Sequence, residues 1–258
     1  MDKGPGDSII SGTIDGTGRL GIVASRVGKD MVSQGSSGIW VEPETSSLVG
    51  NWRWKVLIDD RYTASVRRKY NRNAIIYDAM DRMIRDAWRA KVISQAVVRV
   101  LEVGVGTGNN LPFYESAVTC EMVGIDLSPG MLARARKKPC HVPHELREMD
   151  AQNLALPDAS FDTVLATCVF CTVPDPILGL KEVRRMCRPT GRILLLEHVR
   201  IDKPVIGPLM DLLDPLSVAL VGTHINRRTI ENARLAGLTI DQVEAIQGDL
   251  VKLIHAHP

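Results

Sequence analysis

The sequence contains no apolar run that reaches the ~18 residues of a membrane-spanning helix, so no such helix is expected. Its first seven residues lack the basic start and apolar stretch of a secretory signal. We therefore expect a cytoplasmic protein, with peripheral contact at the inner face of a membrane left open. The net charge of +2 gives no argument for a nucleic-acid partner, and none is expected. The oligomeric state stays open.

The cysteines number five, and their odd count and scattered spacing argue against a disulfide framework. Cys168-Val169-Phe170-Cys171 has the spacing of a redox pair, but redox pairs open a helix, whereas this one follows a predicted strand. We interpret it as two buried thiols at a strand end. No second C-x-x-C or nearby histidine pair completes a zinc site, so no metal is predicted.

Two common phosphate-binding motifs are missing as well. The chain has Glu102-Val103-Gly104-Val105-Gly106-Thr107-Gly108 after an apolar run, Val97 to Leu101, that is typical of a buried parallel strand. Counted from the first or second glycine of this loop, the sixth position of the dinucleotide motif G-x-G-x-x-G is Asn109 or Leu111. The pattern G-x-x-x-x-G-K-[ST] does not occur there either.

The glycine loop nevertheless has the chemistry of a nucleoside site. Glycine lets the backbone turn sharply and lets a ligand approach where a Cβ would clash. The helical pattern expected over 108–115 would present its N-terminal N–H groups to an anionic group. Asp126 ends the next predicted strand, where a doubly wound sheet grips the hydroxyls of a ribose.

This order of segments resembles the class I S-adenosylmethionine-dependent methyltransferases, over about residues 66–258. E-x-G-x-G-x-G corresponds to their first motif. The later motifs are matched by residues 125–132, 149–154, 161–170 and 180–197. One departure is Thr190, where the family usually has glycine.

The resemblance implies S-adenosylmethionine as the cofactor, with Asp126 on the ribose and Asp150 at the adenine amino group. The cofactor-binding residues that it implies are Glu102, Gly104, Gly106, Gly108, Asn110, Asp126, Leu127, Met131, Asp150, Ala151, Thr167 and Cys168.

Within the class, the chain is most similar to the branch of ubiquinone/menaquinone C-methyltransferases and bacterial phosphatidylethanolamine N-methyltransferases. Four segments carry this similarity: 70–78, 169–176, 196–200 and 225–229. They match the phospholipid enzymes better than the quinone enzymes. We expect methylation of a phospholipid amine such as phosphatidylethanolamine. Animal thiol-methylating enzymes share much of the pattern, so a small thiol or a quinol is the alternative acceptor. A protein that binds S-adenosylmethionine without catalysis is the alternative of another class.

Candidate residues for the acceptor follow from the same pattern. His198 ends a predicted strand and is expected to act as a base or to orient the acceptor, or else to be a structural histidine. Tyr70 and Tyr77 are candidates to close the site over the methyl group, and Tyr77 could equally pack in the core. Asn226, Arg227 and Arg228 would bind an acceptor phosphate, or would cap and solvate the following helix.

The chain is expected to form an α/β fold: a Rossmann-like, mostly parallel sheet of seven strands with helices on both faces. We divide it into a flexible Gly/Ser-rich tail (1–50), a mostly helical lid with nine basic residues between 61 and 91 (51–94), and the cofactor-binding domain (95–258). The apolar insertion at 204–222 would be buried core or the wall of an acceptor pocket. Strands are predicted near 97–103, 120–126, 144–148, 161–167, 191–198, 238–246 and 249–256, and helices near 62–94, 108–115, 128–138, 175–187 and 226–236.

Overall fold

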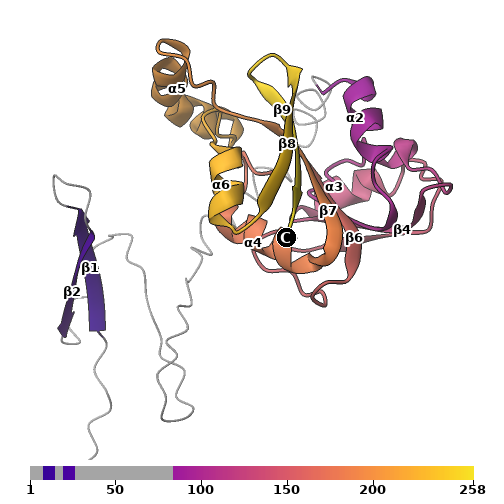
Figure 1. Ribbon diagram of the computed structural model, residues 1–258, viewed down its shortest axis with the longest axis horizontal. Coiled ribbons are helices and arrows are strands. Elements are labelled where there is room, and N and C mark those ends of the chain that lie inside the picture. Colours follow the sequence, from indigo (N-terminus) through magenta and orange to yellow (C-terminus); the bar gives the residue numbers. More distant parts are fainter. Residues whose placement is uncertain (1–7, 15–19, 27–83) are drawn as a thin grey trace, which may run out of the picture. The chain divides into compact units, whose positions relative to one another are not determined.

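The computed structural model describes residues 8–14, 20–26 and 84–258. The chain divides into two compact units, Met1–Asp60 and Arg61–Pro258 (Figure 1). In the first unit, β1 (Ser8–Ile14) pairs with β2 (Leu20–Arg26) as an antiparallel hairpin. For this segment we expect a flexible tail, with a small β structure as the weaker alternative. A hairpin signal is present in the sequence, because small or apolar residues alternate with others in each half: Ile10, Gly12 and Ile14, then Leu20, Ile22 and Ala24.

The second unit is built on a seven-stranded sheet with the order β5-β4-β3-β6-β7-β9-β8. β9 runs antiparallel to β7 and β8, and all other neighbouring strands of this sheet are parallel, which confirms the predicted fold class. The strands are β3 (Val98–Val103), β4 (Thr119–Asp126), β5 (His144–Glu148), β6 (Phe161–Thr167), β7 (Cys187–His198), β8 (Thr239–Gln247) and β9 (Val251–His257).

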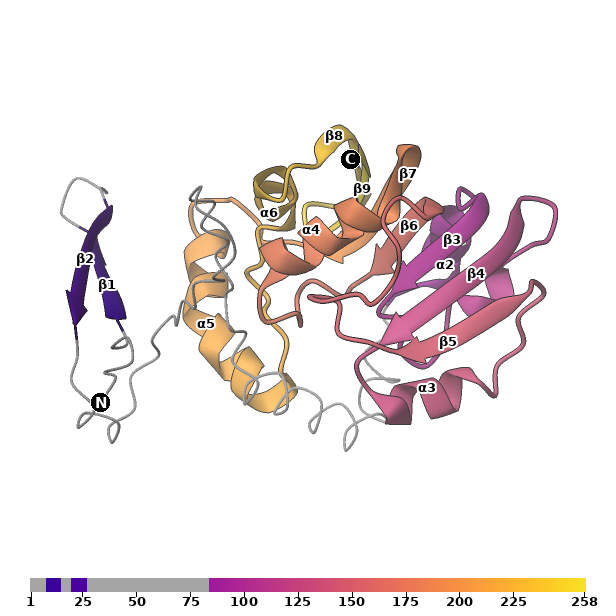
Figure 2. The ribbon, with the colours of Figure 1, turned by 90° about the horizontal axis from the view of Figure 1, so that it is seen from below.

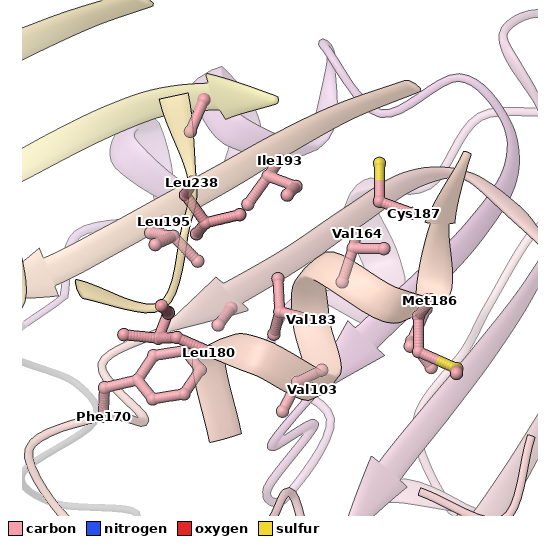
Figure 3. Close-up of a cluster of buried hydrophobic side chains, with 14 of the residues drawn as sticks. Val103, Val164, Phe170, Leu180, Val183, Met186, Cys187, Ile193, Leu195 and Leu238 are labelled. Carbon is pink, nitrogen blue, oxygen red and sulfur yellow. The ribbon is translucent and has the colours of Figure 1, made fainter. Parts of the chain in front are cut away.

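Helices cover both faces of this sheet, and each face has its own apolar cluster (Figure 2). On one face, α4 (Pro176–Met186) and α6 (Thr229–Leu235) pack over a cluster that includes Val164, Leu180 and Val183 (Figure 3). On the other face, α2 (Asp86–Ile93) and α3 (Pro129–Ala135) pack over the second cluster.

The starts of α3 and α4 have the same local cause. Ser128 and Asp175 are N-caps whose side chains accept backbone N–H groups of the first turn, and a proline follows each of them. A capping oxygen satisfies an orphan N–H, and proline fits the first helical position because it needs no N–H there. The start of α3 is thereby held directly after Asp126.

One predicted helix, over 108–115, is wrong in length. The chain forms only a 3-10 turn, η1 (Leu111–Phe113). Gly108 has φ +81°, which is not helical, and Tyr114 has an extended backbone (φ −73°, ψ 127°), so no regular helix spans 108–115. The predicted helix at 62–94 is observed as α2, and its part before residue 84 lies outside the described residues.

The apolar insertion forms a helix, α5 (Ile206–Val221), which we did not predict. Met210 and Asp214 face inward, but Val205, Leu212 and Leu220 are 77%, 75% and 71% exposed. Most of the insertion is therefore exposed and is not buried core. The residues of α5 do not line the larger cavity described below. Among the described residues, no helix is both long and apolar enough to cross a membrane.

Candidate functional site

Two adjoining cavities lie at the carboxyl ends of β3, β4, β6 and β7, the edge at which open α/β sheets bind ligands. The larger has a volume of about 340 Å³ and the smaller about 70 Å³. They share Gly104, Asp126, Val169 and Thr172. The site therefore has one continuous floor formed by the strand ends.

The glycines of the loop have different roles. A Cβ on Gly104 would lie 2.5 Å from Val169 Cγ2, and one on Gly108 would lie 2.9 Å from Ala135 Cα, so both positions need glycine for packing within the protein. Gly106 has φ +57°, and a Cβ there would meet only a carbonyl oxygen 3.9 Å away. Gly106 thus faces open space in the cavity, as close approach of a ligand requires. Gly108 does not line the described cavities.

Asp126 is fixed by the two segments on either side of it. Its Oδ2 accepts the N–H of Gly106 at 2.9 Å and its Oδ1 accepts the N–H of Ser128 at 2.8 Å. Each carboxylate oxygen keeps a further lone pair for a ligand hydroxyl. Burial raises the pKa of Asp126 to about 6 in the absence of ligand, against the two backbone hydrogen bonds that favour the carboxylate.

The smaller cavity is lined by three more of the predicted cofactor residues, Leu127, Asp150 and Ala151, while Met131 lines the larger one. The carboxylate of Asp150 accepts the backbone N–H of Gln152 at 2.9 Å and its side-chain amide at 3.0 Å. These contacts orient Asp150 within a small, half-covered recess next to Asp126.

A buried polar network forms another part of the wall of the larger cavity. Asn110 donates to Glu102 Oε1 at 2.9 Å and to Thr167 Oγ1 at 3.0 Å, and its own oxygen accepts from Arg89 at 2.9 Å. The hydroxyl of Tyr114 donates to Glu102 Oε2 at 2.8 Å. Sequence reasoning identified Glu102, Asn110 and Thr167 but missed Arg89, because nothing in a run of basic residues shows which one turns inward.

The remaining wall of the larger cavity comes from distant segments. Its residues include Cys171, Thr172, His198, Thr223, Ile225, Gln247, Leu250 and Val251. His198 is half-buried, and burial lowers its pKa, so its imidazole is neutral near pH 7. His198 thus lies in the wall of the larger cavity with a neutral imidazole.

The two cysteines of C-x-x-C lie on the loop after β6, and all the cysteines are free thiols. Cys171 is buried, and burial raises the pKa of its thiol well above the ordinary value. Cys168 is half-buried, lines the cavity and has φ +52°, a conformation that costs a non-glycine residue free energy and is common at ligand sites.

Glu197 is a further residue of the site that the sequence did not reveal as such. It is fully buried, and its Oε1 accepts the N–H groups of Val169 (2.9 Å) and Phe170 (3.2 Å). Burial raises its pKa to about 7. Glu197 thereby holds the loop that carries Cys168 in place.

The residues predicted to bind an acceptor phosphate lie outside the cavity wall. Asn226 donates to Asp211, Arg227 to the carbonyl of Val173, and Arg228 to Glu231. Arg228 is the N-cap residue of α6 but makes no side-chain capping hydrogen bond, and only its contact with Glu231 lies in the first turn of that helix. Tyr70 and Tyr77 lie outside the described residues.

Comparison with known proteins agrees with this geometry. A family model described as a methyltransferase domain matches residues 101–195. The phosphatidylethanolamine N-methyltransferase of Cereibacter sphaeroides is 41% identical over 152 residues, covering 56% of this chain and 72% of that protein. The demethylmenaquinone methyltransferase of Deinococcus radiodurans is 38% identical over 138 residues, covering 52% of this chain and 57% of that protein.

Solved structures share the fold. A chain from the complex between the Trm112 methyltransferase activator of Haloferax volcanii and a putative methyltransferase has a TM-score of 0.55 at 17% identity, covering 73% of this chain and 96% of that chain. An N-methyltransferase of Haemonchus contortus, solved with phosphomonomethylethanolamine and S-adenosylhomocysteine, has a TM-score of 0.55 at 19% identity and covers 69% of this chain and 46% of that chain.

The residues present fit S-adenosylmethionine. Gly106 leaves room for close approach, Asp126 offers two acceptor oxygens for a ribose, and Asp150 stands in the recess beside it. The cofactor supplies an activated methyl group on its sulfonium, so the protein needs to hold donor and acceptor in line rather than supply a nucleophile. The chain belongs to the class I S-adenosylmethionine-dependent methyltransferases.

Proposed function

We propose that the chain methylates the amine of a membrane phospholipid such as phosphatidylethanolamine. The observation that carries this proposal is the position of α5. Its exposed leucines form an apolar surface, and Thr223 and Ile225, which line the cavity, follow directly after its end at Val221. A helix of this kind can enter the interfacial region of a bilayer without spanning it. The similarity to the phosphatidylethanolamine enzyme of Cereibacter sphaeroides supports the same acceptor.

The acceptor amine needs a base. An alkylammonium group with a pKa near ~10 has no lone pair for the methyl group until it loses a proton. His198 is neutral near pH 7 because burial lowers its pKa, and it lines the cavity at the end of β7. We assign His198 the role of accepting that proton or of orienting the amine, while the apolar wall at Ile225 and Leu250 excludes water.

A quinol or a small thiol is the second candidate acceptor. It is supported by the mostly apolar wall formed by Ile225, Leu250 and Val251, which suits an uncharged ring, and by the similarity to demethylmenaquinone methyltransferases. These acceptors need no membrane surface for the transfer itself, which makes the two candidates separable.

The first test is an acceptor panel. Release of S-adenosylhomocysteine is measured with phosphatidylethanolamine in vesicles, with a soluble thiol and with a quinol. We expect turnover with the lipid. Rapid methylation of the thiol or quinol without turnover of the lipid would refute the proposal.

The second test is vesicle co-sedimentation. Burying one leucine side chain contributes about 1.5–3 kcal/mol, so Leu212→Ser and Leu220→Ser are each expected to weaken binding about tenfold or more. Leu235→Ser on α6, another exposed leucine, is the matched control and should have little effect. Binding to phosphatidylglycerol vesicles should also weaken as the salt concentration rises, because salt screens the attraction between the basic residues at 61–91 and the anionic lipid head groups. Wild-type protein that stays in the supernatant at low salt would contradict the lipid assignment.

A further inference from the structure

Helix α5 turns a carboxylate toward the protein and leucines toward solvent, which is the reverse of an ordinary surface helix. Asp214 is 8% exposed and Ser217 is half-buried, whereas the leucines of this helix are exposed. Surface helices normally bury an apolar stripe and leave their carboxylates in water. Burying a carboxylate costs free energy unless hydrogen-bond donors surround it. The reason for the inward position of Asp214 therefore lies in the groups that it binds.

Both oxygens of the Asp214 carboxylate bind the segment that follows the helix. Oδ1 accepts the backbone N–H of Ile225 at 2.8 Å, and Oδ2 lies 2.8 Å from Nδ1 of His224. About one turn further along α5, the hydroxyl of Ser217 donates to the carbonyl of Thr223 at 2.8 Å. Each of these three consecutive residues thus has a hydrogen-bond partner on α5.

The same segment is held from a second direction by the loop after β6. The backbone N–H of His224 donates to the carbonyl of Cys171 at 2.8 Å. Thr223, Ile225 and Cys171 line the larger cavity, whereas Asp214 does not. Helix α5 therefore acts on the cavity through the residues on either side of His224.

We propose that Asp214, assisted by Ser217, is a positioning residue for the methyl acceptor. It fixes the backbone of Ile225 and the ring of His224, and thereby the part of the cavity wall to which Thr223 and Ile225 belong. Methyl transfer needs donor and acceptor in line, and a displacement of ~1 Å can lower the rate by up to roughly 100-fold. The inference rests on the proposed function in one respect, that this wall faces the acceptor. It holds equally for a lipid amine, a thiol or a quinol.

The test measures acceptor kinetics and cofactor binding in the full chain. Release of S-adenosylhomocysteine gives kcat/KM for phosphatidylethanolamine in vesicles, for a soluble thiol and for a quinol, and calorimetry gives the Kd of S-adenosylmethionine. Asp214→Ala removes both oxygens and is expected to lower kcat/KM about tenfold or more for the acceptor that is turned over. The Kd should stay nearly unchanged, because Asp126 is held by Gly106 and Ser128 and not by α5.

Two further variants separate positioning from a merely structural role. Asp214→Asn keeps an oxygen for the backbone N–H that Asp214 binds, and its amide can donate to Nδ1 of a neutral His224, so it should restore most of the lost kcat/KM. Asp211→Ala is the matched control, because Asp211 lies on the same helix and accepts from Arg200 and Asn226, neither of which lines the larger cavity. It should retain the wild-type kcat/KM although it, too, loosens α5.

Wild-type kcat/KM in Asp214→Ala would overturn the proposal. An equal loss in Asp211→Ala would also overturn it, in favour of a role only in holding α5. If Asp214→Ala does not fold, Ser217→Ala decides, since it removes a single hydroxyl: kcat/KM should fall about threefold or more, and an unchanged value overturns the proposal.

The outcome is separable from that of the phospholipid assignment. Turnover of the thiol or the quinol without the lipid would refute that assignment, and the variants would then be compared on the acceptor that reacts. Absence of turnover with all three acceptors would overturn both proposals.

Discussion

Replacing Asp126 by alanine tests the centre of the cofactor site. The substitution removes two carboxylate oxygens that lie between the N–H groups of Gly106 and Ser128 and face the cavity. Hydrogen bonds from neutral donors to a carboxylate contribute about 1.5–3 kcal/mol, so S-adenosylmethionine should bind roughly 10- to 150-fold more weakly.

The same carboxyl group predicts a pH dependence of binding. Its pKa is about 6 in the free protein, above the ordinary 3.8, and the ribose hydroxyls need the ionised form as acceptor. Affinity should therefore be constant above pH 7 and fall as the pH drops through 6. At pH 5 roughly one molecule in eleven is ionised at this site, so wild-type affinity should be about tenfold lower than at pH 8.

Isothermal calorimetry at pH 5, 6, 7 and 8 checks both expectations. Asp126→Ala should show the weaker Kd together with a flatter pH profile, because the titrating group is gone. Asp158→Ala is the matched control, since Asp158 is exposed and pairs with Arg185 away from the cavity. Unchanged affinity in Asp126→Ala, or a wild-type Kd that does not vary between pH 5 and 8, would refute the reasoning.

Two further predictions concern stability. Glu197 has a pKa of about 7 in the folded protein against 4.5 for an ordinary glutamate, so the folded state binds more protons and the free energy of unfolding should fall by up to roughly 3 kcal/mol as pH rises from 4.5 to 7. Glu197→Gln should remove this part of the slope in urea titrations at pH 5 and 8, and parallel wild-type and variant profiles would contradict it. A protein that begins at Asn51 should keep its Tm and its cofactor affinity, because a two-stranded hairpin such as β1–β2 adds little stability by itself. A fall in Tm of many degrees would show that the first 50 residues stabilise the second unit.

Most of the sheet could be predicted because its strands have a local signal; β5 is the exception, since it contains a single apolar residue, Leu146. Buried parallel strands are nearly continuous apolar runs, and all seven strands lie within a few residues of their predicted positions. The start of β7 at Cys187 instead of 191 is the largest shift, since Pro189 and Gly191 interrupt the apolar pattern. The α5 helix was missed for the same reason: Pro208 and Pro215 look like breaks, although Pro208 lies in the first turn, where no N–H is needed.

Candidate site residues could be predicted only where their position follows from the local backbone, at a strand end or in a turn. Gly106 and Asp126 have roles that follow from a strand, a turn and the next strand, and the structure joins them by a hydrogen bond of 2.9 Å. Arg89 could not be found in this way, because its partner Asn110 is 21 residues away and becomes a neighbour only when α2 packs on the sheet. Glu197 and His198 are adjacent in sequence, but consecutive strand residues point to opposite faces, so one is buried while the other lines the cavity.

The contrast between residues close in sequence and residues that only the fold brings together also explains why the acceptor is harder to infer than the cofactor. The half that we propose for the nucleoside is formed by two short segments, 104–107 and 126–128, which hydrogen bonds from Gly106 and Ser128 to Asp126 join, so its chemistry is visible in a few consecutive residues. The half that we propose for the acceptor is a wall that only the complete fold brings together, and its residues are Cys171, Thr172, His198, Thr223, Ile225, Gln247, Leu250 and Val251. Each of these side chains can change without disturbing the glycine loop. Selectivity among amines, thiols and quinols should therefore depend on positions such as Thr223 and Gln247, where an exchange would change acceptor turnover while leaving the Kd of S-adenosylmethionine nearly unchanged.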